Sequence, residues 1–262
     1  MTTMTHHVFS QPATLVGHRG LGKGVVEGQL ENSLGSFLGA VDAGLDWVEV
    51  DVRRTMDDRL FVAHDAFAGS GFLTRMTEGE AKSAGGLRLE DLLEALPPAV
   101  GVVFDVKSSL EDAGRDRSAT TATLLARAGK AAAWKRPVAA LSFDPASLRH
   151  LREERPGLPL GLLTWTRFPV GLAVAAAAHL DVQVLAIHAG SLWPSSAATP
   201  ADVPSLHEVV AHVHQAHRQL MVWCPNRVQT RELVAAGADA LVVDNVPRKI
   251  RVRARALLPG QD

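Results

Sequence analysis

The sequence is short of three things that would direct its interpretation: cysteine, an excess of one charge and a long apolar run. Its 262 residues contain one cysteine, Cys224, which excludes an intramolecular disulfide and a metal site built from several cysteines. The 27 basic and 28 acidic residues give a formal net charge of −1. Binding to nucleic acid through bulk positive charge is therefore not expected.

Apolar runs long enough for a membrane span are also missing. Residues 1–15 are polar and lack the apolar centre of an export signal. The alanine-rich run Val170–Leu180 is too short to cross a bilayer. Hydrophobic residues make up 47% and charged residues 21% of the chain, which is typical of a globular protein with a large core. We therefore expect a cytoplasmic protein with no membrane span and no nucleic-acid partner.

Short apolar runs alternate with longer segments of helical periodicity, a pattern typical of an α/β fold with a parallel sheet. The candidate strands are Thr14–Gly17, Trp47–Val52, Leu60–Ala63, Val102–Val106, Val138–Ser142, Leu160–Thr164, Val182–Ile187, Leu220–Trp223 and Ala240–Val243. The candidate helices are Glu31–Ala43, Arg88–Leu96, Ser118–Ala133, Ala146–Glu154, Gly171–His179, Val203–His217 and Gln229–Ala236.

The third candidate strand does not fit a parallel arrangement. It follows Val52 after a short turn-forming segment, 55–58, whereas a parallel crossover needs a dozen or more residues. We expect it to return as a hairpin beside the second strand, so that the other eight strands close a single (β/α)8 TIM barrel. The barrel is predicted over residues 14–250, with an N-terminal extension 1–13 and a C-terminal tail 251–262.

Two carboxylates are the first candidate functional residues. Glu49 and Asp51 alternate with valines, and side chains two apart on a strand share a face. The outer face of a barrel strand packs on helices, so the carboxylates are expected inside the barrel near its C-terminal mouth. Buried charges there need a partner or a metal. The alternative is a solvated edge strand of alternating polarity.

The same alternation recurs around Asp105 and Lys107. A third inward carboxylate would complete an oxygen-rich site for Mg²⁺ or Ca²⁺. A lysine beside it suits a phosphate group as a compact charge. The alternative is a buried Asp–Lys pair that only fixes packing.

Two histidines, His18 and His64, directly follow candidate strands. Histidine donates or accepts protons near neutral pH, and Arg19 beside the first can bind an anion through two hydrogen bonds. A single histidine at the end of a strand can be structural. Two of them on either side of an acidic pair favour acid/base catalysis.

Three other patterns are weaker. The segment 17–24 resembles the start of a P-loop, but Gly24 stands where the Ser or Thr is required and no helix is predicted after it. The histidines within 207–217 lack the spacing of a zinc protease, and we expect a solvated helix face. Cys224 has no obvious base nearby in the sequence, and we interpret it as a small core residue.

Taken in order, these residues resemble the glycerophosphodiester phosphodiesterase family, within the PI-phospholipase-C-like barrels. The resemblance runs from about Val16 to Pro247. The motifs that carry it are His18-Arg19-Gly20, Glu31-Asn32-Ser33, Glu49-Val-Asp51, Val62-Ala-His64-Asp65, Asp105-Val-Lys107, Ser142-Phe143, Trp223-Cys-Pro-Asn226 and the segment from Gly237 to Asp244.

The resemblance implies a role for each of these groups. The general acid/base pair would be His18 and His64. The ligands of one divalent cation, Mg²⁺ or Ca²⁺, would be Glu49, Asp51 and Asp105. The phosphate- and substrate-binding residues would be Arg19, Lys107 and Trp223. The residues that support the metal side, at the opening of the first helix, would be Glu31 and Asn32.

The implied activity is the metal-dependent hydrolysis of glycerophosphodiesters, as small-molecule substrates, to sn-glycerol 3-phosphate and an alcohol. Asp105 stands where the family usually has Glu, whereas sphingomyelinase D-like relatives have Asp. A lysophospholipase D or sphingomyelinase D-like activity on choline lysolipids is therefore the alternative, and a barrel that binds a diester without turnover is a third. The short segment 66–99 predicts an open site that accepts bulky or varied head groups.

Overall fold

Eight parallel strands form one closed ring in the described part of the chain, which comprises residues 7–9, 13–69, 71–108, 110–132, 135–193, 204–248 and 250 of this computed structural model. In ring order they are β1 (Thr14–Gly17), β4 (Trp47–Arg54), β9 (Gly101–Val106), β10 (Val138–Ser142), β11 (Leu160–Thr164), β12 (Val184–His188), β13 (Gln219–Trp223) and β14 (Ala240–Val243). Because β1 pairs with both β14 and β4, the ring is closed. The predicted TIM barrel is confirmed.

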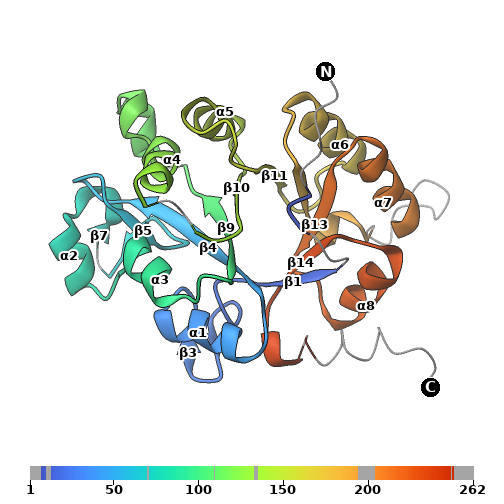
Figure 1. Cartoon of the computed structure of the whole chain (residues 1–262), viewed down its shortest axis with the longest axis horizontal. Coiled ribbons are helices and arrows are strands. Elements are labelled where there is room, and N and C mark those ends of the chain that lie inside the picture. Colours follow the sequence, from blue (N-terminus) through green and yellow to red (C-terminus); the bar gives the residue numbers. More distant parts are fainter. Residues whose placement is uncertain are drawn as a thin grey trace.

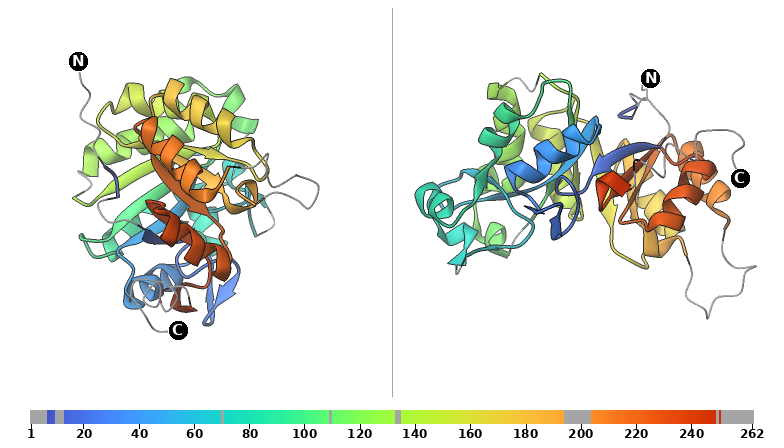
Figure 2. Two further views of the ribbon diagram at one scale, coloured as in Figure 1. Left: turned by 90° about the vertical axis from the view of Figure 1, so that its right-hand side faces the viewer. Right: turned by 90° about the horizontal axis from the view of Figure 1, so that it is seen from below.

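Helices cover the outside of this ring (Figure 1). They are α1 (Leu34–Asp42), α2 (Glu78–Ser83), α3 (Leu89–Ala95), α4 (Thr121–Ala132), α5 (Pro145–Glu154), α6 (Val170–His179), α7 (Leu206–Gln215) and α8 (Arg227–Ala236). The side view in Figure 2 shows α6, α7 and α8 following one another around the barrel. None of the described helices combines the length and the apolarity that crossing a bilayer requires.

The extra hairpin strand is also confirmed. Strand β5 (Leu60–Val62) runs antiparallel to β4, with Val52 opposite Val62, and β8 (Leu87–Arg88) adds to its free edge. The short segment after it holds a small hairpin of β6 (Phe67–Ala68) and β7 (Gly71–Phe72), followed by α2, β8 and α3. A small cap was predicted for this segment and stays a prediction, and the helix α2 within it was not predicted.

The first helix begins later than the sequence pattern indicated. Ser33 is its N-cap, and its side chain accepts a hydrogen bond from the backbone N–H of Ser36. Glu31 and Asn32, expected to open the helix, therefore lie in the turn before it. Asn32 has a φ of 57°, a left-handed conformation that asparagine tolerates better than most residues.

The region that resembled a P-loop forms a small hairpin instead. Strand β2 (Val25–Val26) pairs antiparallel with β3 (Gln29–Leu30). The backbone N–H of Gly24 donates to Oε2 of Glu31, and the segment is followed by β2 rather than by the helix that a P-loop requires. A nucleotide-binding loop is thereby excluded here, as the sequence predicted.

Two apolar layers follow from the strand alternation. Outward residues such as Val48, Val50 and Val52 pack into the layer beneath the helices. Inward residues fill the barrel below its mouth; they include Val16, Val103, Leu141, Met221 and Val242.

Part of the predicted N-terminal extension closes the lower end of the barrel. Phe9 is buried among the inward residues, edge-on to Trp47 at 5.2 Å between ring centroids. Its backbone N–H donates to Oε1 of Gln219 at 3.1 Å. The loop predicted after the sixth strand, 193–203, and the tail 251–262 lie outside the described residues, except for Trp193.

Candidate active site

Three carboxylates meet at the C-terminal ends of β4 and β9. Asp51 lies opposite Asp105 in the register of these strands, and Glu49 lies two residues earlier on the same face. Their side chains offer ligand atoms that all lie within 4.8 Å of one another. Glu49, Asp51 and Asp105 are only 6%, 1% and 7% exposed, so the alternative of a solvated edge strand is wrong.

Lys107, just beyond the end of β9, is the first of two cations in this cluster. Its Nζ lies 2.8 Å from Oδ1 of Asp51 and donates to Oδ2 of Asp105. The predicted Asp–Lys pair therefore exists, but it shares its lysine with a second buried carboxylate. Packing alone does not account for so many charges at one place.

Arg19 is the second cation, and it joins the carboxylates to the turn before α1. Its backbone N–H donates to Oε2 of Glu49 at 3.0 Å, and its NH1 donates to Oε1 of Glu31 at 2.6 Å. Its Nε lies 3.2 Å from Oδ2 of Asp51. Glu31 thus holds this guanidinium in place.

The three carboxylates repel one another, and this repulsion is reflected in their pKa values. Burial and repulsion by Asp51 raise the pKa of Glu49 to about 8. Burial also raises the pKa of Asp105, although Lys107 opposes the rise. Burial opposes ionisation of Asp51 too, but the attraction of Lys107 and Arg19 prevails and lowers its pKa. A divalent cation would offset the repulsion that remains.

The donor atoms suit a hard cation. Two buried oxygens, Oδ1 of Asp105 and Oδ1 of Asn32, have no hydrogen-bond partner among the described residues. Nδ2 of Asn32 donates to Oδ2 of Asp51 at 2.9 Å, which places the amide against the carboxylate cluster. Carboxylate and amide oxygens are ligands that Mg²⁺ and Ca²⁺ accept, so the residues present fit such an ion.

His18 directly follows β1 and is buried. Its Nδ1 lies 2.8 Å from Oδ1 of Asp244, which follows β14. Burial disfavours the charged imidazole, but hydrogen bonds to Asp244 and Cys224 and attraction by Glu49 outweigh it and raise the pKa of His18 to about 10. At neutral pH the ring is therefore an imidazolium, with Nε2–H available as a proton donor.

His64 is more accessible and has a similar partner. Its Nδ1 lies 2.8 Å from Oδ1 of Asp65, which leaves Nε2 to exchange a proton. Arg53 fixes the backbone here by donating two hydrogen bonds, of 2.9 and 2.8 Å, to the carbonyl oxygen of His64. Arg53 was not predicted as a site residue, although it shares the inward face of β4 with Glu49 and Asp51 and lines the same cavity as His64.

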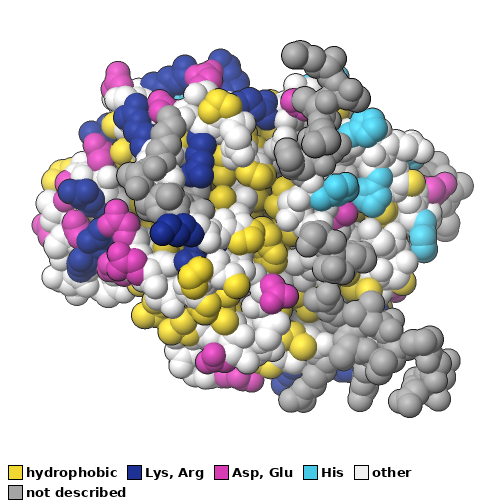
Figure 3. All heavy atoms as spheres, in the orientation of Figure 1, with side chains coloured by type: hydrophobic (Ala, Val, Ile, Leu, Met, Phe, Trp, Pro, Cys, Tyr) yellow, Lys and Arg dark blue, Asp and Glu magenta, His cyan; other side chains and the backbone are white. Residues whose placement is uncertain are grey.

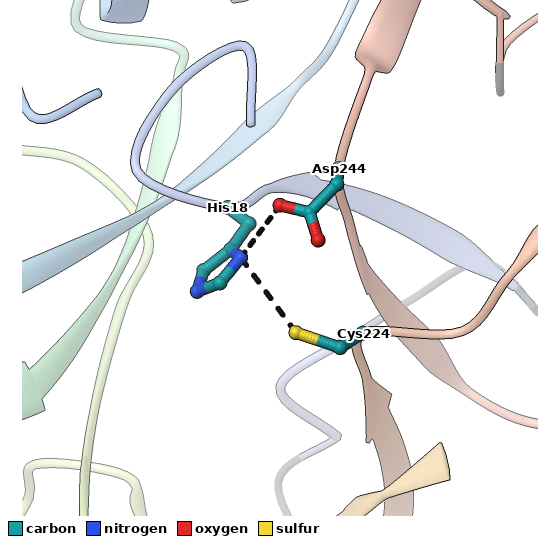
Figure 4. A group of neighbouring side chains, drawn as sticks. All are labelled: His18, Cys224 and Asp244. Atoms are coloured by element: carbon teal, nitrogen blue, oxygen red, sulfur yellow. Dashed lines mark hydrogen bonds and ion pairs between the residues drawn. The ribbon is translucent and has the colours of Figure 1, made fainter. Parts of the chain in front are cut away.

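The expectation for Cys224 was wrong. Its side chain is half-buried at the end of β13, and its Sγ lies 3.8 Å from Nδ1 of His18 (Figure 4). Its φ is 56°, in the left-handed region. Cys224 and Asp244 thus both contact the imidazole, and neither was assigned to the site from the sequence. The one available signal was their position directly after a strand.

A cavity of about 330 Å³ joins these groups. Its lining combines ionisable residues with apolar and aromatic ones. The ionisable residues include His18, His64, Glu49, Asp105 and Lys107. The apolar and aromatic residues include Leu141, Leu163, Met221, Phe143, Trp165 and Trp223.

Trp223 lines the cavity, as the resemblance implied. Its buried Nε1–H has no hydrogen-bond partner among the described residues. Phe143 meets it edge-on at 5.8 Å between ring centroids and stacks on Trp165 at 4.1 Å. Trp165 is 63% exposed and extends the aromatic wall to the mouth.

The histidines of α7 do not contribute to this cavity. His207, His212 and His214 are exposed, and Nε2 of His214 lies 2.8 Å from Oδ2 of Asp239. Figure 3 shows histidine side chains gathered on the surface in the region of α6 and α7. The predicted solvated helix face is confirmed.

Replacing Asp244 by asparagine tests the environment of His18. The raised pKa of His18 means that this pairing stabilises the fold fully below about pH 6.5 and loses that effect as the pH rises through about 10. The pKa of Asp244, the partner of His18, is lowered to about 2 although burial opposes this. The stabilisation by the pair is therefore fully present above pH 3.8 and is lost as the pH falls through about 2.

We therefore expect the difference in unfolding free energy between wild type and Asp244→Asn to be largest between about pH 4 and 6.5. It should shrink steadily toward pH 10. NMR titration of the histidine ring should show the pKa of His18 falling toward its ordinary value in the variant. A stability difference that is flat with pH would contradict the pairing.

The arrangement defines a class of protein: a TIM-barrel enzyme whose ionisable groups lie at the C-terminal ends of the strands, where such barrels carry their active sites. The family follows from comparison of the sequence. Residues 18–248 match the Glycerophosphoryl diester phosphodiesterase family, and the chain belongs to it. It is therefore a phosphodiesterase.

Individual relatives agree with this assignment. The chain is 25% identical over 246 residues to a glycerophosphodiester phosphodiesterase from Caldanaerobacter subterraneus subsp. tengcongensis, covering 88% of this chain and 93% of that protein. Among solved structures it is similar in fold to a glycerophosphodiester phosphodiesterase from Thermotoga maritima, with a TM-score of 0.70, 21% identity and coverage of 95% and 100% of the two chains.

A second similar structure is that of a phosphodiesterase from Oleispira antarctica in complex with the product sn-glycerol-3-phosphate. The TM-score is 0.72 at 18% identity, and the match covers 93% of this chain and 97% of that one.

Proposed function

We propose that this phosphodiesterase hydrolyses a small glycerophosphodiester to sn-glycerol 3-phosphate and an alcohol, using one divalent cation and a pair of histidines. The observation that carries the proposal is that Glu49 and Asp105 line one cavity together with His18 and His64, and that the buried Asp51 completes their carboxylate cluster. The product bound by the Oleispira antarctica phosphodiesterase supports the same substrate class.

Glu49, Asp51 and Asp105 would hold the cation, which when bound would offset phosphate charge and polarise a phosphoryl oxygen. Arg19 and Lys107 line the same cavity and add two fixed positive charges beside Asp51. A phosphodiester is an anion, and more negative charge develops on its oxygens in the transition state. Fixed positive charge in a buried site therefore lowers the barrier.

The histidines divide the proton transfers. His18, with its pKa of about 10, carries the proton that the leaving alcohol oxygen must gain. His64 has its Nδ1 paired with Asp65, so its Nε2 is placed to accept the proton of the attacking oxygen. One water is consumed overall, and its proton replaces the one that His18 gives to the alcohol.

Trp223 and Phe143 form the wall against which the glycerol or the leaving group would lie. The aromatic faces suit the apolar side of a glycerol backbone. The exposed ring of Trp165 continues this wall toward bulk solvent, as a site with a small cap allows.

That apolar wall also favours a second candidate, a lysophospholipase D or sphingomyelinase D-like cleavage of choline lysolipids. Leu141, Leu163 and Met221 continue it into the barrel. The sequence feature that also favours this second candidate is Asp105, which is one methylene shorter than the glutamate usual in the family. Such an enzyme would cut on the other side of the phosphate and release the free head group.

Product analysis with and without metal tests both candidates. The purified protein is given glycerophosphocholine, glycerophosphoethanolamine and lysophosphatidylcholine, each with Mg²⁺, with Ca²⁺ or with EDTA. We expect glycerol 3-phosphate from the two small diesters, and we expect EDTA to lower the rate at least about 100-fold, since cation stabilisation is worth several kcal/mol. Choline from the lysolipid without glycerol 3-phosphate would favour the second candidate. Full activity in EDTA would remove the metal from the proposal.

A further inference from the structure

A second set of metal-ligating side chains surrounds Nδ1 of His18, apart from the three carboxylates. Oδ1 of Asp244 lies 2.8 Å and Sγ of Cys224 lies 3.8 Å from that nitrogen, and the three ligand atoms all lie within 4.8 Å of one another. They follow the neighbouring strands β1, β14 and β13, and Figure 4 shows the carboxylate and the thiol pointing at the same ring nitrogen.

The spacing is near that of a tetrahedral zinc site. Zn–N bonds of about 2.0–2.1 Å and Zn–S bonds of about 2.3 Å at tetrahedral angles place nitrogen and sulfur about 3.6 Å apart, and nitrogen and carboxylate oxygen about 3.4 Å apart. The sulfur is therefore already within a few tenths of an ångström of its place. The carboxylate must move back by roughly 0.6 Å, a small rotation of a side chain that is partly exposed.

The backbone around the three residues is held in place. The N–H of Cys224 donates to the carbonyl oxygen of Val242 at 3.0 Å, and the N–H of Lys23 donates to Oδ1 of Asp244 at 2.8 Å. The N–H of His18 donates to the carbonyl oxygen of Val243 at 3.2 Å. Ligands on fixed strand ends lose little freedom when they bind an ion.

We propose that His18, Cys224 and Asp244 form a binding site for a thiophilic divalent cation such as Zn²⁺, separate from the carboxylate site, and that its occupation inhibits the enzyme. Thiolate and imidazole ligands select zinc, whereas Mg²⁺ and Ca²⁺ prefer oxygen ligands alone. The two sites are therefore expected to sort cations by ligand type.

Binding changes the protons on His18. Three bonds form, to Nδ1, Sγ and a carboxylate oxygen, while the Nδ1 proton and the thiol proton pass to solvent. The ring then keeps a proton only on Nε2 and is no longer an imidazolium, so it is a much weaker acid and cannot accept a second proton there. The predicted inhibition therefore depends on the proposed role of His18 as the proton donor to the leaving oxygen. The predicted binding of the ion does not depend on that role.

Protection of the thiol from alkylation tests the binding. Cys224 is the only cysteine in the chain, so intact mass reports its modification by iodoacetamide without ambiguity. We expect Zn²⁺ in stoichiometric excess to slow alkylation of the wild-type enzyme at least about tenfold, and Mg²⁺ at the same concentration to leave it unchanged, because a metal-bound thiolate is a poor nucleophile. Equal alkylation rates with and without Zn²⁺ would overturn the site.

Inhibition of the enzyme held at saturating Mg²⁺ tests the consequence, with each variant normalised to its own uninhibited rate. The Zn²⁺ concentration for half-inhibition is expected to rise at least about tenfold in Cys224→Ser, which keeps the size of the side chain and loses the soft ligand. Equal inhibition of both proteins, relieved by more Mg²⁺, would place zinc at the carboxylates and overturn the proposal. Protection of the thiol without inhibition would leave the metal site standing and contradict the proposed role of His18.

Discussion

Replacing His64 by alanine is expected to lower kcat on glycerophosphodiesters at least about 100-fold, the usual scale for loss of a general acid or base. The side chain lines the cavity beside Asp105 and Lys107, and Asp65 holds its Nδ1 so that Nε2 is the nitrogen left for proton exchange. Without it, water must accept the proton of the attacking oxygen. Steady-state kinetics at saturating metal measure the effect.

The matched control is His212→Ala, because His212 is an exposed histidine on α7, outside the cavity. It should keep the wild-type rate. Asp65→Asn should fall between the two, since it keeps the base and weakens the group that orients it. Wild-type turnover by the His64 variant would remove this residue from the mechanism.

The position of His64 also shows what the sequence could predict. Alternation of polar and apolar residues predicted Glu49 and Asp51 on one face of the strand and the valines on the other. In the structure both faces of this strand are buried, as a closed barrel requires. The hairpin was predictable too, because the seven residues between Val52 and Leu60 are too few for a parallel crossover. Both results follow from local geometry, which a sequence carries directly.

The surroundings of His18 were not predictable in the same way. Asp244 and Cys224 lie 226 and 206 residues from it along the chain. They reach the imidazole only because closure of the barrel brings β14 beside β1, and strand alternation says nothing about which rotamers then meet. Cys224 was assigned to the core because no obvious base lies near it in the sequence, and its place directly after a strand was the better guide.

The start of the first helix was also not predictable from local sequence. Apolar periodicity extended the first helix back to Glu31, but Ser33 caps it and Asn32 adopts a left-handed conformation. The two residues before the cap instead reach Arg19 and Asp51 through their side chains. Their use in the site overrides the local preference for helix.

The largest expected effect is that of Asp51→Asn. Asp51 is 1% exposed and has three partners: Lys107 at 2.8 Å, Nε of Arg19 at 3.2 Å and Nδ2 of Asn32 at 2.9 Å. Asparagine keeps its size and removes its charge. We expect the loss of a metal ligand to lower kcat/KM at least about 1000-fold, which corresponds to about 4 kcal/mol of transition-state stabilisation.

Metal-induced stabilisation separates this effect from misfolding. A ligand at 100 times its Kd stabilises the folded protein by about 2.7 kcal/mol. If the substitution weakens binding 100-fold, the same metal concentration stabilises the variant by only about 0.4 kcal/mol. Thermal unfolding with Mg²⁺ or Ca²⁺ and with EDTA therefore reports directly on the site.

Asp46→Asn is the matched control, since Asp46 is an exposed aspartate just before the same strand. It should show the full metal-dependent shift in Tm. An equal shift in wild type and Asp51→Asn would mean that the cation is held without Asp51. The three carboxylates would then no longer be the ligand set, and the raised pKa of Glu49 would need another purpose, such as donating a proton to the substrate.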